Sequence, residues 1–265
     1  MISSRRSFIT GIKSIKLSSK ERSFLKKFKP WGVILFSRNI KSINQVYNLT
    51  KEIRKIFKDK KYPILLDQEG GRVNRLKKFI NADLFSNKFF GDLYLKDKKK
   101  FNNYYKIYID KTSYLLKQIG ININTVPVLD IRNNGSSKII GDRSFSNKID
   151  VINDIGNIWI KSFHNNNIGT VIKHIPGHGL AKVDSHLLTP FVNKKIKYLM
   201  KNDFSTFRSK KSFFAMTAHI IYREIDNLVL HCNGKFNEMM LVAKNSPIVD
   251  KFIVKKTSQF YKILS

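Results

Sequence analysis

The sequence contains little cysteine, few acidic side chains and no long apolar run. Cys232 is the only cysteine among the 265 residues, so no internal disulfide can form, which is typical of a reducing compartment. No segment approaches the roughly 18 consecutive apolar residues that a membrane-spanning helix requires. Residues 1–20 are basic but lack the apolar core of a signal peptide. We therefore expect a cytoplasmic protein with no membrane partner.

Several cofactor and metal signatures are absent as well. The sequence has no G-x-G-x-x-G, which weakens a dinucleotide-binding interpretation, and no G-x-x-x-x-G-K-[ST] to cradle a phosphate. The zinc motif H-E-x-x-H is also missing. His174 and His178 are four residues apart, but Pro176 lies between them and prevents a helix from presenting both on one face. We therefore predict neither a cofactor nor a metal site.

Positive charge, by contrast, is abundant. The 50 lysines and arginines outnumber the 19 acidic residues and give a formal net charge of +31. A charge of this size suits nucleic-acid binding. However, the lysines are spread along the whole chain, with only short clusters at residues 58–61 and 96–100, and Asn and Ile are abundant beside them. This pattern indicates a general compositional bias, so we predict no specific nucleic-acid partner, only non-specific attraction to polyanions such as acidic glycans.

The hydrophobic pattern alternates between short apolar, β-branched runs and longer segments with helical spacing. It predicts strands over residues 31–37, 62–67, 121–131, 170–174 and 213–219, and helices over 43–57, 102–120 and 150–169. Residues 247–254 are a weaker candidate for one further strand. Strands that alternate with helices are typical of βαβ units and a parallel α/β sheet.

Residues that carry chemistry follow the ends of these predicted strands: Asp67, Asp130, Lys173, His174 and His219. Both a (β/α)8 TIM barrel and a doubly wound sheet bind ligands at the carboxyl ends of their strands. Strand-end chemistry therefore leaves both architectures open, although the missing G-x-G-x-x-G favours the barrel. Five predicted strands fall short of a closed barrel, so we expect a TIM-barrel type fold that is incomplete at its C-terminal end.

The segment LLDQEGGRVNRLK, residues 65–77, ends a predicted strand in Asp67 and turns at two glycines. Arg72 and Arg75 then follow three residues apart. An ionised carboxylate beside a guanidinium suits the recognition of sugar hydroxyls, because the carboxylate accepts two or more hydrogen bonds. A structural ion pair at the strand end explains the same residues equally well.

A second segment, GDRSFSNK at residues 141–148, allows a similar choice. Asp142 and Arg143 either pair with each other or face a ligand. The segment is explained equally well as the start of a helix that Ser146 caps.

The segment KHIPGHGLAKVDSH, residues 173–186, holds three histidines in a glycine-rich stretch. Asp184 and His186 are two residues apart, so an extended backbone turns both to the same side. A carboxylate bonded to an imidazole fixes the tautomer of the ring and stabilises its protonated form, which suits proton transfer near neutral pH. A chance pair of neighbours in a loop is the alternative. The position beyond a strand end favours a mobile catalytic loop.

Taken together, DQEGGRVNR, GDRSF, KHIPGHG followed by DSH, and MTAH resemble the β-N-acetylglucosaminidases of glycoside hydrolase family 3. The four motifs occur in the order and spacing of that family, and the resemblance covers about residues 8 to 226. It implies a (β/α)8 barrel and a retaining hydrolase that releases terminal β-linked N-acetylglucosamine from peptidoglycan fragments during cell-wall recycling. It also implies a sugar or muropeptide as the partner, and we expect a monomer.

The resemblance assigns roles to seven residues. Asp67 would hold sugar hydroxyls, and four further residues would line the sugar subsite: Arg75, Arg143, Lys173 and His174. His186, paired with Asp184, would be the general acid/base, a role that most retaining glycosidases give to a second carboxylate.

The C-terminal part departs from the family pattern. Family members carry an aspartate nucleophile in a segment resembling SDDL, some thirty to forty residues after MTAH, and no such segment follows Asp226. Asp250 lies near the expected distance with flanks that do not match, and Glu238 falls on a predicted helix, so we assign no nucleophile. We divide the chain into a partial barrel domain, 1–226, and a divergent tail, 227–265. The alternative function is a catalytically inactive glycan-binding relic or truncated paralogue, and the unpaired strand edges of a partial barrel predict self-association.

Overall fold

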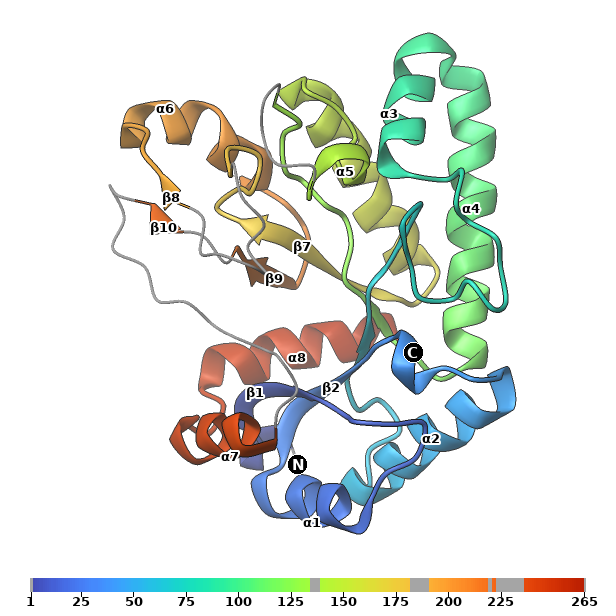
Figure 1. Ribbon diagram of the computed structural model, residues 1–265, viewed down its shortest axis with the longest axis vertical. Coiled ribbons are helices and arrows are strands. Elements are labelled where there is room, and N and C mark those ends of the chain that lie inside the picture. Colours follow the sequence, from blue (N-terminus) through green and yellow to red (C-terminus); the bar gives the residue numbers. More distant parts are fainter. Residues whose placement is uncertain (1, 134–138, 182–190, 219–220, 223–235, 265) are drawn as a thin grey trace.

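The computed structural model describes residues 2–133, 139–181, 191–218, 221–222 and 236–264 (Figure 1). Its main sheet holds six strands in the order β1 (Arg6–Gly11), β2 (Pro30–Leu35), β3 (Ile64–Leu66), β6 (Ile123–Asn124), β7 (Gly169–Ile175) and β9 (Phe214–Thr217). Every neighbouring pair is parallel, and the spatial order follows the chain. A doubly wound sheet reverses its order, whereas a (β/α)8 barrel does not. The described residues therefore form a half-barrel, which confirms the predicted incomplete TIM-barrel type.

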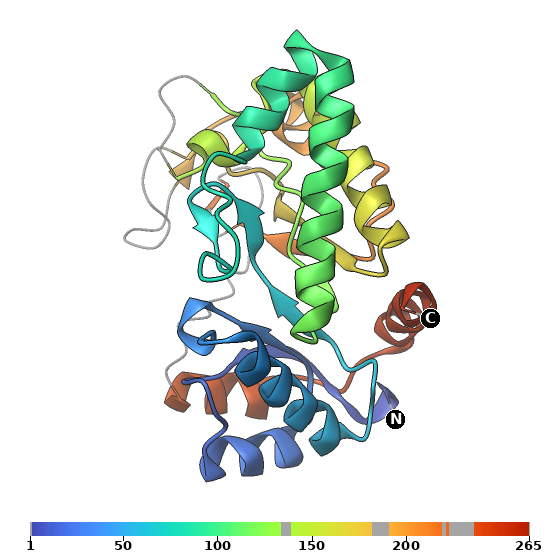
Figure 2. The ribbon, with the colours of Figure 1, turned by 90° about the vertical axis from the view of Figure 1, so that its right-hand side faces the viewer.

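Helices join these strands and cover one face of the sheet (Figures 1 and 2). They are α1 (Ser19–Phe28), α2 (Ile43–Phe57), α3 (Asn87–Lys96), α4 (Lys98–Gln118), α5 (Ile149–Asn165) and α6 (Ile196–Lys201), with short 3-10 helices at Ile2–Ser4, Ser37–Asn39, Gly141–Arg143 and Asp203–Phe207. Two small sheets lie outside the half-barrel. An antiparallel pair joins β4 (Gln68–Gly70) to β5 (Val73–Asn74), and a parallel pair joins β8 (Phe191–Val192) to β10 (Ile221–Tyr222).

The helices form where capping residues meet apolar side chains at helical spacing. In α2 the Ser42 hydroxyl accepts a hydrogen bond from the Gln45 backbone N–H, while Val46, Leu49 and Ile53 turn one buried stripe toward the sheet. These side chains share one hydrophobic cluster with Ile64 and other outward-facing sheet residues. Helix packing thus fixes the convex side of the half-barrel.

All five predicted strands and all three predicted helices are present, although some bounds differ. The predicted strand 121–131 pairs regularly only at Ile123–Asn124, because Pro127 has no N–H to donate. Beyond it the chain still runs beside β7, since the Leu129 N–H donates to the Lys173 carbonyl over 2.8 Å. The sequence interpretation missed β1, whose segment RSFITG has too few apolar residues to give a clear signal.

The further strand predicted over residues 247–254 is wrong. Only Ile248 forms a bridge, with Arg6, before the chain enters α8 (Lys251–Ile263). The Asp250 carboxylate accepts the Ile253 backbone N–H over 2.8 Å and so caps that helix. Thr257 and Phe260 follow at helical spacing and are fully buried, so tertiary packing decides in favour of the helix.

The C-terminal segment fills the inner face of the half-barrel near the amino ends of its strands. Val249 and Phe260 join four sheet residues in one buried cluster: Trp31, Leu65, Ile123 and Val171. The Trp31 indole N–H donates to the Thr257 hydroxyl over 2.8 Å in a buried bond. Gly169 leaves the room for Phe260, because a Cβ there would lie 2.7 Å from that ring. In Figure 1, α8 accordingly runs beside β2 below β7 and β9.

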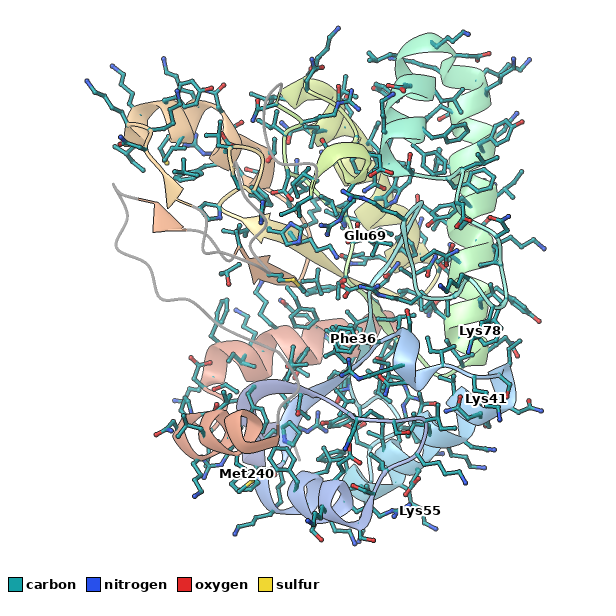
Figure 3. The ribbon with its side chains drawn as sticks, viewed as in Figure 1. Phe36, Lys41, Lys55, Glu69, Lys78 and Met240 are labelled. Atoms are coloured by element: carbon teal, nitrogen blue, oxygen red, sulfur yellow. The ribbon has the colours of Figure 1, made fainter. Side chains whose placement is uncertain are left out.

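The tail also covers the outer edge of β1. The Ser7 N–H donates to the Pro247 carbonyl and the Val249 N–H to the Arg5 carbonyl, both over 2.8 Å. Helix α7 (Phe236–Asn245), which carries Met240, packs against β1 (Figure 3). At the opposite edge, no strand among the described residues pairs with the far side of β9. One edge of the half-barrel is thus covered by the tail. No helix in the described part of the chain is both long and apolar enough to cross a bilayer.

Phe260 and Phe252 on the same helix provide a test of this packing. We expect Phe260→Ala to lower the free energy of unfolding by about 3–5 kcal/mol, because it empties a fully buried position on the sheet. Phe252, which is 64% exposed, is the matched control, and Phe252→Ala is expected to change it by no more than about 0.5 kcal/mol. Urea unfolding measures both, and equal losses would contradict the docked position of α8.

Candidate functional site

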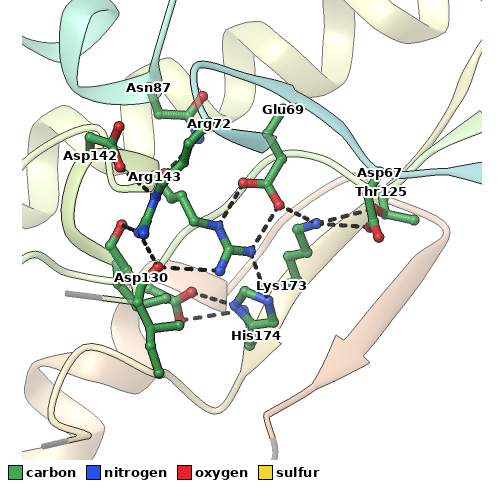
Figure 4. Close-up of polar contacts among 12 residues, drawn as sticks. Asp67, Glu69, Arg72, Asn87, Thr125, Asp130, Asp142, Arg143, Lys173 and His174 are labelled. Carbon is green, nitrogen blue, oxygen red and sulfur yellow. Dashed lines mark hydrogen bonds and ion pairs between the residues drawn. The ribbon is translucent and has the colours of Figure 1, made fainter. Parts of the chain in front are cut away.

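Three neighbouring strands bring polar side chains together at their carboxyl ends (Figure 4). Asp67 follows β3, Thr125 follows β6, and Lys173 and His174 lie near the carboxyl end of β7. Because these strands are parallel and adjacent, their carboxyl ends meet at one edge. The Lys173–His174 peptide bond is cis. The site therefore lies at the end of the sheet where barrel enzymes carry their chemistry.

The ammonium of Lys173 is the buried centre of this group. Its Nζ lies 2.5 Å from Glu69 Oε1, 3.2 Å from Asp67 Oδ1 and 3.1 Å from the Thr125 hydroxyl. The Lys173 side chain is only 2% exposed. Figure 3 shows Glu69 well inside the molecule, whereas Lys41, Lys55 and Lys78 lie at its periphery. Lys173 thus neutralises two carboxylates that burial would otherwise disfavour.

Arg143 holds the second side of Glu69. Its Nε and one terminal nitrogen donate to the two carboxylate oxygens of Glu69 over 2.8 and 2.9 Å, which is a bidentate ion pair. Asn87 fixes the Arg143 backbone by donating to its carbonyl over 2.6 Å. Asp142 pairs instead with Arg72, at 2.8 Å. The proposed Asp142–Arg143 pair is therefore wrong, and so is Ser146 as a helix cap, because α5 follows Lys148 without a side-chain cap.

His174 has a defined tautomer. Its Nδ1 lies 2.6 Å from Asp130 Oδ2, and its Nε2 lies 3.4 Å from a terminal nitrogen of Arg143. A guanidinium can only donate, so Nε2 acts as an acceptor and Nδ1 carries the proton that Asp130 accepts. Asp130 is completely buried and serves to orient the ring. Among the described residues, no three His, Cys, Asp or Glu side chains gather as a metal site.

The three carboxylates of this network stay ionised. Burial alone would raise the pKa of Asp67, but the Lys173 ammonium and the Thr125 hydroxyl lower it below its ordinary value. Burial acts in the same way on Glu69, where Lys173 and Arg143 lower the pKa strongly. Asp130, also buried, has its pKa lowered by His174. Glu69 in turn raises the pKa of Arg143 against its burial. The site presents fixed charges at neutral pH.

Exposure divides the network into a rim and a buried support. Four side chains keep some exposure, between 13% and 31%: Asp67, Arg75, Arg143 and His174. The remaining members, Glu69, Lys173 and Asp130, are at most 2% exposed. A terminal nitrogen of Arg75 lies 3.7 Å from Asp67 Oδ2, whereas Lys173 contacts the other carboxylate oxygen, Oδ1. The rim therefore offers acceptors and donors side by side, as a sugar with several hydroxyls requires.

The structure brings five of the seven sequence-predicted site residues into this network. The other two, Asp184 and His186, lie outside the described residues, as does His219. The described chain that leads toward them is anchored at the site, because the His178 N–H donates to Asp130 Oδ1 over 2.7 Å. Gly179 then passes close to the Ile131 carbonyl, where a Cβ would lie 2.1 Å away. The described residues that precede Asp184 and His186 in the chain therefore lie beside the network.

Sequence reasoning missed the supporting roles of Glu69, Thr125 and Asp130. Glu69 is part of the quoted motif DQEGG, but nothing in the sequence pairs it with Arg143, 74 residues away. Asp130 was identified only as a strand-end acid. Its partner follows from the adjacency of β6 and β7, which a single sequence does not reveal.

The acids considered as nucleophiles in the C-terminal part lie elsewhere. Asp250 caps α8 at the amino end of the sheet, and Glu238 falls on α7 beside β1. Near the network the described residues include two further acids: Asp142, which is paired with Arg72, and Asp203, whose pKa burial and the charge of Asp130 raise to about 6. Asp67, Glu69 and Asp130 are all held in ion pairs. Asp203 is only 2% exposed, so none of these acids is both unpaired and exposed for attack on a sugar.

A parallel half-barrel with charged donors and acceptors at the carboxyl ends of its strands is typical of a barrel enzyme that acts on a polar ligand. The model of the glycosyl hydrolase family 3 N-terminal domain matches residues 6–244. The chain belongs to glycoside hydrolase family 3.

Relatives and solved structures agree with this assignment. A β-hexosaminidase from Alkalilimnicola ehrlichii is 32% identical over 229 residues, which cover 84% of this chain and 64% of the relative. β-Hexosaminidase A from Pseudoalteromonas piscicida is 31% identical over 74% of this chain and 34% of its own length. The crystal structure of native NagZ from Neisseria gonorrhoeae superimposes with a TM-score of 0.77 at 27% identity, covering 85% of this chain and 66% of NagZ. The chain thus spans about two thirds or less of these relatives.

Removal of the central cation tests the network. We expect Lys173→Met to lower the free energy of unfolding at pH 7 by about 3–5 kcal/mol, because it leaves buried carboxylates without a counter-charge. Lys88→Met breaks an exposed pair with Asp92 and is the control, with an expected loss below about 0.5 kcal/mol. Urea unfolding of both variants at pH 7 makes the comparison.

The loss of unfolding free energy in Lys173→Met should also depend on pH. In the folded chain Lys173 lowers the pKa of Asp67 and Glu69, so the contribution of these two carboxylates is fully present above the unfolded carboxyl range near pH ~4 and is progressively lost as pH falls from there through the folded values. The difference between the wild-type chain and Lys173→Met should therefore shrink between pH 7 and pH 3. A constant difference would show that Lys173 stabilises the fold by packing alone.

Proposed function

We propose that the half-barrel binds terminal β-linked N-acetylglucosamine at the rim formed by Asp67, Arg75, Arg143 and His174. The observation that carries the proposal is the ion-paired support beneath this rim, which holds a carboxylate, two guanidinium groups and an imidazole acceptor together. NagZ from Neisseria gonorrhoeae, solved in complex with N-trifluoroacetyl-D-glucosamine, superimposes on this chain with a TM-score of 0.73 at 26% identity. Asp67 would accept hydrogen bonds from sugar hydroxyls, and the two arginines would donate to sugar oxygens.

For catalysis, His186 paired with Asp184 would protonate the leaving oxygen and later activate water, in a retaining hydrolysis. Retention also requires a carboxylate nucleophile about 5–5.5 Å from the proton-transfer group. The described residues near the rim offer no carboxylate that is both exposed and unpaired, because the acids of the network are paired, Asp203 is buried and Asp250 lies at the other end of the sheet. This observation favours a second candidate function, a chain that binds the sugar without hydrolysing it.

For both candidate functions, the ligand class that we propose is an N-acetylglucosamine-containing fragment of peptidoglycan. We also propose that the chain acts in the cytoplasm and as a monomer. The β-hexosaminidase relatives support the sugar, and the domain division at residue 226 would leave the whole rim within the first part.

Sugar binding and turnover separate the candidates. We expect N-acetylglucosamine to raise the Tm of the chain. Asp67→Asn should abolish this rise because it removes the charged acceptor, and His186→Ala should leave it unchanged because that residue is assigned to chemistry. Turnover of a chromogenic N-acetyl-β-glucosaminide is measured on the same samples.

The outcomes are distinct. Turnover that His186→Ala removes supports the hydrolase. A rise in Tm without turnover supports the binding protein. Neither binding nor turnover, in a chain that unfolds cooperatively, would overturn the proposed function altogether.

A further inference from the structure

A second polar cavity lies at the opposite end of the half-barrel from the sugar rim. Its volume is about 220 Å³, which is smaller than the pockets that take drug-sized ligands. Four basic residues line it: Arg5 before β1, Lys26 and Lys29 at the end of α1, and Lys58 at the end of α2. These elements all adjoin the amino ends of strands, so the cavity is separate from the network around Lys173.

The lysines of this cavity lack counter-charges. Among the described residues, the ammonium groups of Lys26, Lys29 and Lys58 make no hydrogen bond or ion pair. Helices α1 and α2 both end at the cavity, and the C-terminus of each carries a partial negative charge of about half a unit from its helix dipole. Asp59 neutralises Arg5. Two helix ends and one carboxylate offset about half of four positive charges, so about two remain, which matches a dianion.

The floor of the cavity is rigid. The Arg5 side chain is 4% exposed, is held by Asp59, and donates to the Tyr261 hydroxyl over 3.0 Å. Its guanidinium lies 4.7 Å from the centre of the Tyr62 ring, and Phe57 stacks on that ring at 3.9 Å. These contacts use two of the guanidinium nitrogens, and the group carries five N–H donors in all. Arg5 is therefore a fixed, nearly buried cation beside three exposed ones.

We propose that this cavity binds a phosphate group, either as inorganic phosphate or as a small phosphate monoester. Arg5 provides directed donors from the floor, and Lys26 and Lys58 close over the anion from two different helices. The apolar wall of Phe57 lowers the local dielectric and strengthens these contacts. Because Tyr261 of α8 shares the Arg5 guanidinium, the bound anion adjoins the docked tail.

Calorimetric titration of the full chain with inorganic phosphate, at constant ionic strength in sodium chloride, tests the proposal. We expect saturable binding with one site. The double variant Lys26→Gln with Lys58→Gln should weaken it at least about tenfold, because two charge contacts are lost. The matched control, Lys106→Gln with Lys111→Gln on exposed positions of α4, removes the same charge and should bind as the wild-type chain does.

Each outcome decides. Equal weakening in both double variants, or a heat that never saturates, would show general charge attraction and overturn the proposal. A parallel titration with glycerol 3-phosphate distinguishes the sources: binding as tight as inorganic phosphate assigns a monoester, and weaker binding assigns the free anion. Far-ultraviolet circular dichroism confirms that all variants are folded.

Discussion

The buried ammonium of Lys173 is the interaction on which the site depends. It neutralises Asp67 and Glu69, and a buried carboxylate without such a partner is very unfavourable. Lys173 lies in β7, Asp67 follows β3 and Glu69 begins a hairpin, so one side chain joins segments more than one hundred residues apart. Glu69 then positions Arg143, which contacts His174. The rim residues therefore belong to one connected network, and the buried side chains of Lys173 and Glu69 determine its geometry.

The two ends of the half-barrel differ in which segments complete them. At the carboxyl end, β3, β6 and β7 and the segments that follow β3 and β6 suffice to assemble the network, because Glu69 and Arg75 follow β3 in the chain and Arg143 follows β6. At the amino end, Val249 and Phe260 of the tail fill the inner face that further strands would cover in a closed barrel. This division explains how the polar network can form beside a C-terminal part that supplies no described nucleophile.

The sequence predicts the strand-end chemistry but not the pairing. Asp67, Lys173 and His174 follow apolar β-branched runs, and parallel strands bring such ends together, so their proximity could be predicted. The sequence leaves open whether Arg143 pairs with Asp142 or faces a ligand, and its partner in the structure is Glu69, in a buried bidentate pair between residues 74 apart in the chain. The segment PIVDKFIV is apolar enough for a strand. Its second half is helical because the Asp250 cap, a local signal, starts the helix and because Thr257 contacts Trp31, 226 residues away, which local patterns do not encode.

The most direct test of the central claim is a crystal structure of the chain soaked with N-acetylglucosamine. The account predicts the sugar ring at the carboxyl end of the sheet, with its hydroxyls in hydrogen-bond contact with Asp67 and His174 and with Lys173 still between its two carboxylates. A sugar bound elsewhere on the molecule, or a rim left empty at a saturating concentration, would contradict it.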